Sequence, residues 1–191
     1  MKPTIAKNIS YICLLFLTIT VTAQNQKGTF IDANIGLGIT IPNEDVAVSA
    51  NGFYAQVEYI WALKKWFSLR PYTGVITTST DNDELSENLK DAELETKAWL
   101  LGGKFRLRVP IPYVAPFLEL GMGASIGSFI TKTPLINIDT SGVLLHIPIT
   151  IGVGLGKNNK VNVAFAYYFT PKAEQVSGAA ALGITIPLKP K

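Results

Sequence analysis

Apolar residues occupy every second position along much of this chain. Between residues 30 and 41 each odd position is apolar, whereas the even positions are mostly small or polar. The apolar positions are Ile31, Ala33, Ile35, Leu37, Ile39 and Ile41. A repeat of two residues places one set of side chains on each face of an extended strand. The segment is therefore predicted to form a β-strand with one apolar face.

The same alternation recurs seven more times, so we expect eight strands. The other strands are predicted at residues 53–63, 67–77, 97–107, 114–126, 143–153, 161–169 and 180–188. The connections between them are alternately long and short, and the long ones are residues 42–51, 78–95, 131–142 and 171–178. Loops at one end and tight turns at the other are typical of an antiparallel up-and-down β-barrel. The predicted fold class is all-β.

The two faces of the predicted strands differ in bulk. An eight-stranded barrel is only wide enough inside for its own side chains or one small ligand. The apolar set contains too many Ile, Leu, Phe and Trp residues to fit there, whereas the opposite set holds many glycines and nearly all the strand charges. An apolar exterior around a polar, filled interior indicates a transmembrane barrel. A secreted lipocalin-like barrel is the soluble alternative.

Aromatic residues near the predicted strand ends are expected to form two girdles at the borders of the apolar band. The turn-side residues are Trp61, Trp66, Phe67 and Tyr113, and the loop-side residues are Phe53, Trp99, Phe129 and Phe169.

The first residues of the chain have the features of a secretory signal peptide. Lys2 and Lys7 precede an apolar run over residues 11–21, and small residues ending in Ala23 follow it. This run of about a dozen residues is shorter than the roughly 20 that a spanning helix needs. We therefore expect a signal peptide at residues 1–23 and one barrel domain at residues 24–191. The only cysteine, Cys13, lies in the leader, so no disulfide is expected in the exported chain.

Composition excludes two further classes of protein. The chain is 48% hydrophobic and 16% charged, which rules out intrinsic disorder. Its formal charge is +3, and loss of the two leader lysines brings it close to zero. We expect no nucleic-acid partner, because such binding requires an excess of basic residues.

Six ionisable residues are predicted to face the interior near the turn end of the barrel. They are three acids and three permanent bases: Asp32, Glu58, Arg70, Lys104, Arg106 and Glu119. A balanced set of this kind is expected to form a paired network that fills and closes the lumen. The alternative is a charged constriction or a binding site.

The only histidine, His146, bears on whether the chain is an enzyme. A hydrolytic mechanism would require a nucleophile and an acid beside it, and Ser125 with Glu119 is the conceivable pair. These two residues lie six positions apart on one strand, a separation of roughly 20 Å, which a single imidazole cannot bridge. We expect no enzyme, with His146 as a neutral residue lining the lumen.

The 78–95 loop is the most acidic segment. It contains Asp81, Asp83 and Glu84 within four residues, which suggests calcium binding. The EF-hand pattern fails, however, because Leu85, Ser86 and Ala92 occupy positions that require ligands or glycine. A solvated acidic surface is expected instead, and no metal or cofactor is predicted. Basic residues gather at the opposite, turn end.

Four short stretches carry a resemblance to a known family: Ala23-Gln24, Arg70-Pro71-Tyr72-Thr73-Gly74, Ile147-Pro148-Ile149 and residues 113–123. They resemble the small porin-family outer-membrane β-barrel proteins of Bacteroidota. The resemblance implies an eight-stranded barrel in the outer membrane. One departure is the end of the chain, which finishes in Pro190-Lys191 rather than on an aromatic residue.

The expected role is structural or interactive: membrane integrity, adhesion or surface contact. Outer-membrane lipid is the expected surrounding, the barrel is expected to be monomeric, and an extracellular partner would bind through the four long loops. A porin-like barrel or a barrel that transports or binds a small hydrophobic ligand is the main alternative. A lipid-modifying enzyme is a further one.

Overall fold

The chain folds into a closed, eight-stranded antiparallel β-barrel, as the alternation predicts. The computed structural model describes residues 28–43, 46, 48–80 and 92–188. The expected signal peptide at residues 1–23 and most of the acidic loop, with its calcium candidates, lie outside the described residues. Among the described residues, no helix is long and apolar enough to cross a membrane.

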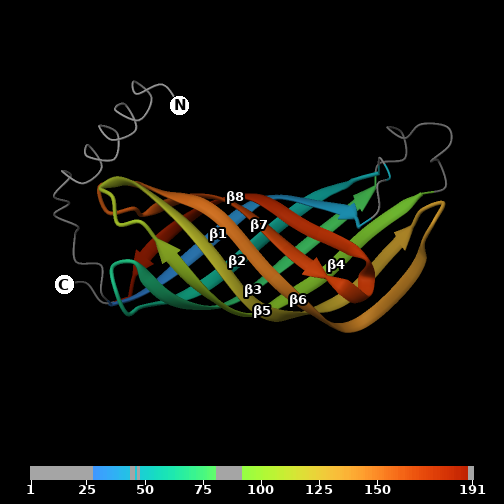
Figure 1. Cartoon of the computed structure of the whole chain (residues 1–191), viewed down its shortest axis with the longest axis horizontal. Helices are drawn as coiled ribbons and strands as arrows, with labels where there is room; N and C mark the ends of the chain where they lie inside the picture. Colours follow the sequence, from blue (N-terminus) through green and yellow to red (C-terminus); the bar gives the residue numbers. More distant parts are fainter. Residues whose placement is uncertain (1–27, 44–45, 47, 81–91, 189–191) are drawn as a thin grey trace, which may run out of the picture.

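Each strand pairs with its neighbours in sequence, and β1 pairs with β8 to close the barrel (Figure 1). The strands are β1 (Gly28–Pro42), β2 (Ala50–Ala62), β3 (Phe67–Thr80), β4 (Glu93–Arg108), β5 (Tyr113–Lys132), β6 (Asn137–Gly156), β7 (Val161–Thr170) and β8 (Gln175–Pro187). A short 3-10 helix, η3 (Pro171–Ala173), joins β7 to β8. The connections β2–β3, β4–β5 and β6–β7 lie at one end, called the turn end, and the remaining connections lie at the loop end.

Two of the four predicted loops are shorter than expected. Residues 131–142 are mostly strand, because β5 continues to Lys132 and β6 begins at Asn137. Residues 171–178 contain only η3 and one further residue before β8 starts at Gln175. In both places the ladder continues while the outward side chains become polar or small, so the apolar signal that marks a strand disappears. The other two loops match to within about three residues.

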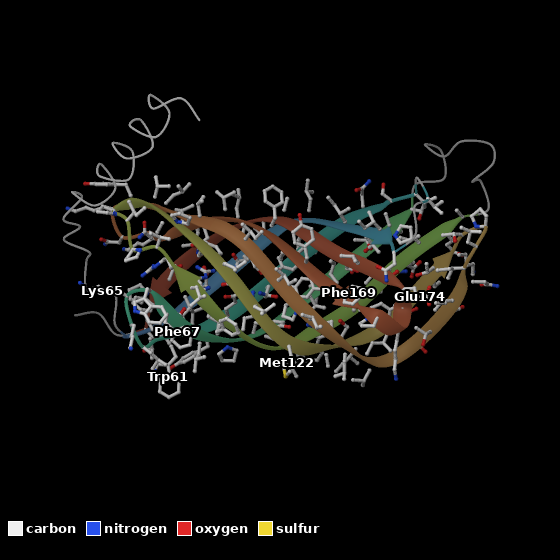
Figure 2. The ribbon with its side chains drawn as sticks, viewed as in Figure 1. Trp61, Lys65, Phe67, Met122, Phe169 and Glu174 are labelled. Carbon is white, nitrogen blue, oxygen red and sulfur yellow. The ribbon has the colours of Figure 1, made fainter. Side chains whose placement is uncertain are left out.

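The predicted faces are confirmed. Every strand carries large apolar side chains on its outward face, and Met122, Leu145 and Leu37 are exposed by 77%, 76% and 71%. Figure 2 shows Met122 pointing away from the barrel wall and Trp61 with Phe67 gathered at the turn end. The turn-end aromatics Trp61, Trp66 and Tyr113 are exposed, as a girdle requires. Phe129 was wrongly assigned to the loop-side girdle: it is 1% exposed and points inward, like the other odd positions of β5.

The interior is stratified rather than uniformly polar. The six predicted ionisable residues lie towards the turn end. Apolar and aromatic side chains fill the middle. Hydroxyl groups fill the loop end together with a small apolar cluster of Val48, Ala50, Ala92 and Leu94. The middle set is Tyr54, Tyr72, Ile76, Leu100, Phe129, Leu144 and Tyr168, and the loop-end set includes Thr40, Thr78, Thr96, Thr131 and Ser177.

Paired glycines make room for the largest interior side chains. Gly102 on β4 lies opposite Gly123 on β5, and the hydroxyl of Tyr72 sits above both. A Cβ atom at Gly102 would lie 2.7 Å from the Tyr72 hydroxyl and 2.5 Å from the carbonyl oxygen of Met122. Both are closer than nonbonded carbon and oxygen approach, so these positions need glycine for space. The neighbouring Gly103 points outward, and a Cβ atom there would meet nothing within 4 Å.

Gly102→Ala is therefore expected to destabilise the barrel by about 1–3 kcal/mol through overpacking. Gly103→Ala, one residue along the same strand, is expected to be neutral or slightly stabilising, since it adds only a strand-compatible methyl group. The urea midpoint of unfolding in detergent micelles, followed by tryptophan fluorescence, separates the two. Equal midpoints would show that the glycines are not required for packing.

Candidate functional site

The six predicted interior charges form a single network. It is called the charge cluster below. Each carboxylate lies near at least two cations. Arg70 Nη1 is 3.0 Å from Asp32 Oδ2, 2.6 Å from Glu58 Oε2 and 3.4 Å from Glu119 Oε1. Lys104 Nζ is 2.6 Å from Glu58 Oε1 and 2.8 Å from Glu119 Oε2. Arg106 Nε is 2.5 Å from Glu119 Oε1, and Arg106 Nη2 is 3.7 Å from Asp32 Oδ2.

The charge cluster is removed from solvent. Its most exposed member, Arg106, is 6% exposed, and Asp32 and Glu119 are fully buried. Burying an ion is expensive unless its partners satisfy it. The register brings the charges together: Asp32 lies opposite Glu58, Arg70 opposite Lys104, and Arg106 opposite Glu119. Like charges face each other in the first two pairs, and the neighbouring strands supply the opposite charge. The three acids and three bases balance.

Neutral residues that the sequence analysis did not single out complete the charge cluster. Asn162 Nδ2 donates to both carboxylate oxygens of Asp32, at 2.9 and 3.0 Å. Thr185 Oγ1 donates to Asp32 Oδ1 at 3.2 Å, and Gln56 Nε2 donates to Glu58 Oε1 at 2.6 Å. The inward parity of positions 56 and 162 was readable from the alternation. The contact of Asn162 with Asp32 was not readable, because β7 and β1 are not adjacent strands. Gln56 and Glu58 lie two residues apart on β2, so their contact is local.

Two aromatic rings border the charge cluster. The guanidinium carbon of Arg106 lies 3.5 Å from the centre of the Phe117 ring, and Lys104 Nζ lies 5.2 Å from the centre of the Tyr72 ring. Cations over aromatic faces gain electrostatic energy that increases when water is excluded. These contacts join the charged layer to the aromatic middle of the lumen.

His146 is held between two hydroxyl groups in the middle layer. Its Nε2 lies 2.5 Å from the Tyr72 hydroxyl, and its Nδ1 lies 2.7 Å from Ser125 Oγ. The sequence analysis judged a triad of Ser125, His146 and Glu119 too widely spaced. That holds for Glu119, whose described contacts are with the three cations of the charge cluster. It does not hold for Ser125, because Gly123, opposite His146, leaves space for the imidazole beside the serine.

This serine–histidine pair lacks two features of a hydrolytic site. A carboxylate normally orients the base through its second ring nitrogen, whereas a tyrosine occupies that position here. Ser125 and His146 are 1% and 2% exposed, so neither presents a surface to a substrate in this conformation. Both ring nitrogens of the buried His146 therefore have a hydrogen-bond partner, as is usual for polar groups in a packed core.

A second hydrogen-bonded chain runs from the charge cluster up the lumen. The Tyr168 hydroxyl donates to Gln56 Oε1 at 2.5 Å, and the Tyr54 and Tyr168 hydroxyls are 2.9 Å apart. Gln56 in turn bonds Glu58, so polar groups connect the charged layer with the aromatic layer without a gap.

Hydroxyl groups from four strands close the loop end. Thr40 Oγ1 lies 2.8 Å from Thr78 Oγ1, 3.3 Å from Thr96 Oγ1 and 3.1 Å from Ser177 Oγ. Beside them, Thr131 Oγ1 donates to the carbonyl oxygen of Ala173 at 2.9 Å, which ties η3 inward over the lumen. In the part of the chain that the structure describes, no group of three or more His, Cys, Asp or Glu residues is arranged to hold a metal.

The fold is that of known small outer-membrane barrels. Neisserial surface protein A (NspA) superposes with a TM-score of 0.60 at 12% identity, over 85% of this chain and 98% of that one. The N-terminal β-barrel domain of Pseudomonas aeruginosa OprF gives 0.50 at 7% identity, over 84% and 100%. Ail, the attachment invasion locus protein of Yersinia pestis, gives 0.48 at 14%, over 85% and 99%. No family model and no curated protein matches the chain.

Glu119→Gln is expected to destabilise the barrel by about 3–5 kcal/mol, because it leaves a buried positive charge without compensation. The double variant Lys104→Met with Glu119→Gln restores neutrality. It should lose less stability than the sum of the two single variants. Unfolding midpoints in urea for the wild type, both single variants and the double variant measure this coupling.

The surface pair of exposed Lys97 and half-buried Glu95 provides the control. Its atoms are 2.7 Å apart, almost the same as Lys104 and Glu119, but solvent screens it. Glu95→Gln should leave the midpoint unchanged. If Glu119→Gln behaves like Glu95→Gln, the charge cluster does not hold the barrel together.

Proposed function

We propose that this protein is a small integral outer-membrane barrel whose closed lumen serves as a structural core and whose role is interactive or structural at the membrane. The observation that carries the proposal is the filled interior: charged, aromatic and hydroxyl-rich layers succeed one another along the barrel and bond mainly to one another. Among the described side chains, Thr150 Oγ1 and Glu119 Oε2 are buried without a hydrogen-bond partner, and Glu119 Oε2 lies 2.8 Å from Lys104 Nζ. Such a lumen stabilises a scaffold that presents its loop end, and its balanced charge favours neither anions nor cations.

The apolar exterior supports the membrane placement. Along β6 the outward residues are apolar from Val143 to Leu155, and above Val143 they change to Ser141, Asp139 and Asn137. Thirteen residues rising about 3.3 Å each and tilted by about 40° cover roughly 30 Å, close to the thickness of a hydrocarbon core. A soluble barrel of the lipocalin kind would need a polar exterior over the same length.

The proposal also includes points that rest on the sequence. The chain is exported through a cleaved signal at residues 1–23, belongs to the porin-family barrels of Bacteroidota and forms a monomeric barrel. At the loop end it contacts a surface partner, and its role is membrane integrity or adhesion. NspA, whose name describes a surface protein, has the same fold.

One observation favours a second candidate, a barrel that binds or transports a small hydrophobic molecule. The middle of the lumen contains Leu100, Phe129 and Leu144, so an apolar ligand that displaced them would find suitable surroundings. The tightly bonded layers at both ends argue against passage of such a molecule.

The protein is expected to fractionate with the outer membrane, and the folded barrel should migrate differently from the heated chain on a denaturing gel. Closed barrels resist detergent unfolding until boiled, because their ladder has no free end to unzip. Recovery in the periplasmic soluble fraction, with no mobility shift, would instead support the lipocalin-like alternative.

The purified barrel is expected to show no stepwise conductance in planar lipid bilayers, since eight strands leave no continuous water path past the charge cluster. A large porin measured in the same bilayers is the positive control. Regular conductance steps would favour the porin-like alternative and would exclude a closed lumen.

Ser125→Ala and His146→Gln are expected to leave the cellular lipid composition unchanged and to lower the unfolding midpoint, because each removes a partner from the Tyr72–His146–Ser125 chain. Mass spectrometry of extracted lipids tests the first outcome and urea unfolding the second. An altered lipid profile in both variants, compared with cells that express the wild type, would support the lipid-modifying enzyme.

A further inference from the structure

The three connections at the turn end carry basic residues and no acidic ones. Residues 62–67, 107–114 and 155–162 contain five lysines and arginines and neither aspartate nor glutamate. The five are Lys64, Lys65, Arg108, Lys157 and Lys160. The acids of the charge cluster are buried in the lumen, where the bases of the same cluster compensate them. The five residues at the turn end are called the basic rim below.

Much of the basic rim is accessible from outside the barrel. Lys64, Lys157 and Lys160 are exposed. Lys65 and Arg108 are half-buried, and Arg108 Nη2 donates to the carbonyl oxygen of Lys65 at 3.0 Å, which joins two of the connections. Figure 2 shows Lys65 at the extremity of the turn end.

The basic rim directly adjoins the apolar outer surface. Lys64 follows the exposed Leu63, and Lys157 lies two residues after Leu155, which ends the outward apolar row of β6. Strand residues rise by about 3.3 Å each, and each headgroup layer of a bilayer is about 5–7 Å thick. With the barrel in the membrane as proposed above, the basic rim therefore lies at the level of the lipid headgroups.

The basic rim surrounds the barrel and does not form one patch. The β2–β3, β4–β5 and β6–β7 connections follow one another around the closed ladder with two strands between successive connections. Each consists of only four residues, 63–66, 109–112 and 157–160, so none extends far beyond the headgroup layer. A folded partner would contact one side of such a ring, whereas lipid headgroups surround a membrane barrel completely.

An aromatic residue of the turn-side girdle lies beside the basic rim. Lys64 Nζ is 5.5 Å from the centre of the Trp66 ring, and the Trp66 and Phe67 ring centres are 5.6 Å apart. Indole rings favour the boundary between headgroups and hydrocarbon. A lysine can keep its methylene stem on apolar surface while its ammonium group reaches polar surroundings. Lys64 is therefore placed where a lipid phosphate group would meet it.

The exterior of the loop end has a different charge arrangement. Lys97 Nζ is 2.7 Å from Glu95 Oε1, and Lys132 Nζ is 2.8 Å from Glu93 Oε2. These two cations are compensated by carboxylates of their own surface. A group of cations with no acid in the same segments is therefore a feature of the turn end.

We propose that the basic rim binds the phosphate groups of anionic phospholipids in the leaflet that it faces. The proposal rests on the membrane placement proposed above. Short turns of outer-membrane barrels face the periplasm, so this leaflet is the periplasmic one. Lys64 with Trp66 provides one contact, and Lys157 with Lys160 provides another on the opposite side of the ring. Each basic residue near an anionic headgroup strengthens its binding about fivefold.

Quenching of tryptophan fluorescence by brominated lipids tests the proposal on the folded barrel in phosphatidylcholine vesicles. Of the three tryptophans, Trp61 and Trp66 report on the turn end and Trp99 reports on the loop side. In Trp99→Phe, brominated phosphatidylglycerol should quench at about one tenth of the mole fraction that brominated phosphatidylcholine requires, as two nearby basic residues allow. In the double variant Trp61→Phe with Trp66→Phe, Trp99 should respond equally to both lipids.

Substitutions of single lysines identify the binding residue. In the Trp99→Phe background, Lys64→Gln should lower the preference for phosphatidylglycerol about fivefold, whereas Lys64→Arg should retain it. Lys97→Gln, which removes a cation from the loop end, is the matched control and should change nothing. The ratio of quenching by the two lipids cancels any change in the brightness of Trp66. Equal quenching by the two lipids before substitution, or a preference that Lys64→Gln leaves intact, would overturn the proposal.

Two further measurements separate other anions from lipid. Sodium phosphate and sodium chloride at equal ionic strength should weaken the preference equally, because both screen the charges alike. A selective loss in phosphate would overturn the proposal in favour of a site for a free anion. Binding of polyglutamate that Lys64→Gln abolishes, together with equal quenching by the two lipids, would assign the basic rim to an acidic polymer instead.

The same experiment distinguishes failure of this proposal from failure of the membrane placement. Quenching by brominated phosphatidylcholine reports insertion of the barrel into the bilayer regardless of headgroup charge. Equal quenching by both lipids would remove the basic rim as a binding site and leave the membrane barrel intact. Absence of quenching by either lipid would contradict the membrane placement itself.

Discussion

Closure of the eight-stranded ladder is the constraint on which the rest of this structure depends. It fixes the width of the interior, so every inward side chain must fit a narrow space and must find its hydrogen-bond partners there. Glycines stand opposite each other where Tyr72 and His146 need room. The charge cluster forms where the five strands β1 to β5 bring acids and bases to one place in the lumen. The interior of this barrel is therefore a core in the ordinary sense, built largely from polar groups.

Because six charges are buried in that core, its stability is sensitive to the substitution of any one of them. Each ion is compensated by at least two others or by an amide, so the stability of one pair depends on its neighbours. Such a network specifies register, because sliding one strand by two residues would separate Arg106 from Glu119 and leave both desolvated. Register in the apolar exterior is less constrained, since one aliphatic residue replaces another at little cost. The charged layer therefore constrains the register of the strands more strictly than the larger apolar surface does.

The sequence predicted the strand number and the six members of the charge cluster, because both follow from parity along a strand. It predicted the antiparallel barrel because long and short connections alternate. The prediction of strand ends failed where the outward residues are no longer apolar, because the alternation can then not be recognised. In residues 131–142 the outer row becomes Asn137, Asp139 and Ser141, so the ladder continues without alternation that can be recognised. Phe129 was placed outside although its odd position already assigned it to the inner row of β5. The contact between Ser125 and His146 was missed because it depends on the register between two strands and on Gly123.

By itself, the sequence determined which residues face inward and which face outward, since a period of two is a local property of an extended chain. Only the tertiary structure decided which inward residues meet. Asn162 reaches Asp32 inside the lumen although their strands are not adjacent, and β6 continues beyond the last residue that pairs with β7. Both depend on the stagger between strands, which closure of the barrel imposes on all eight together and which no single segment encodes.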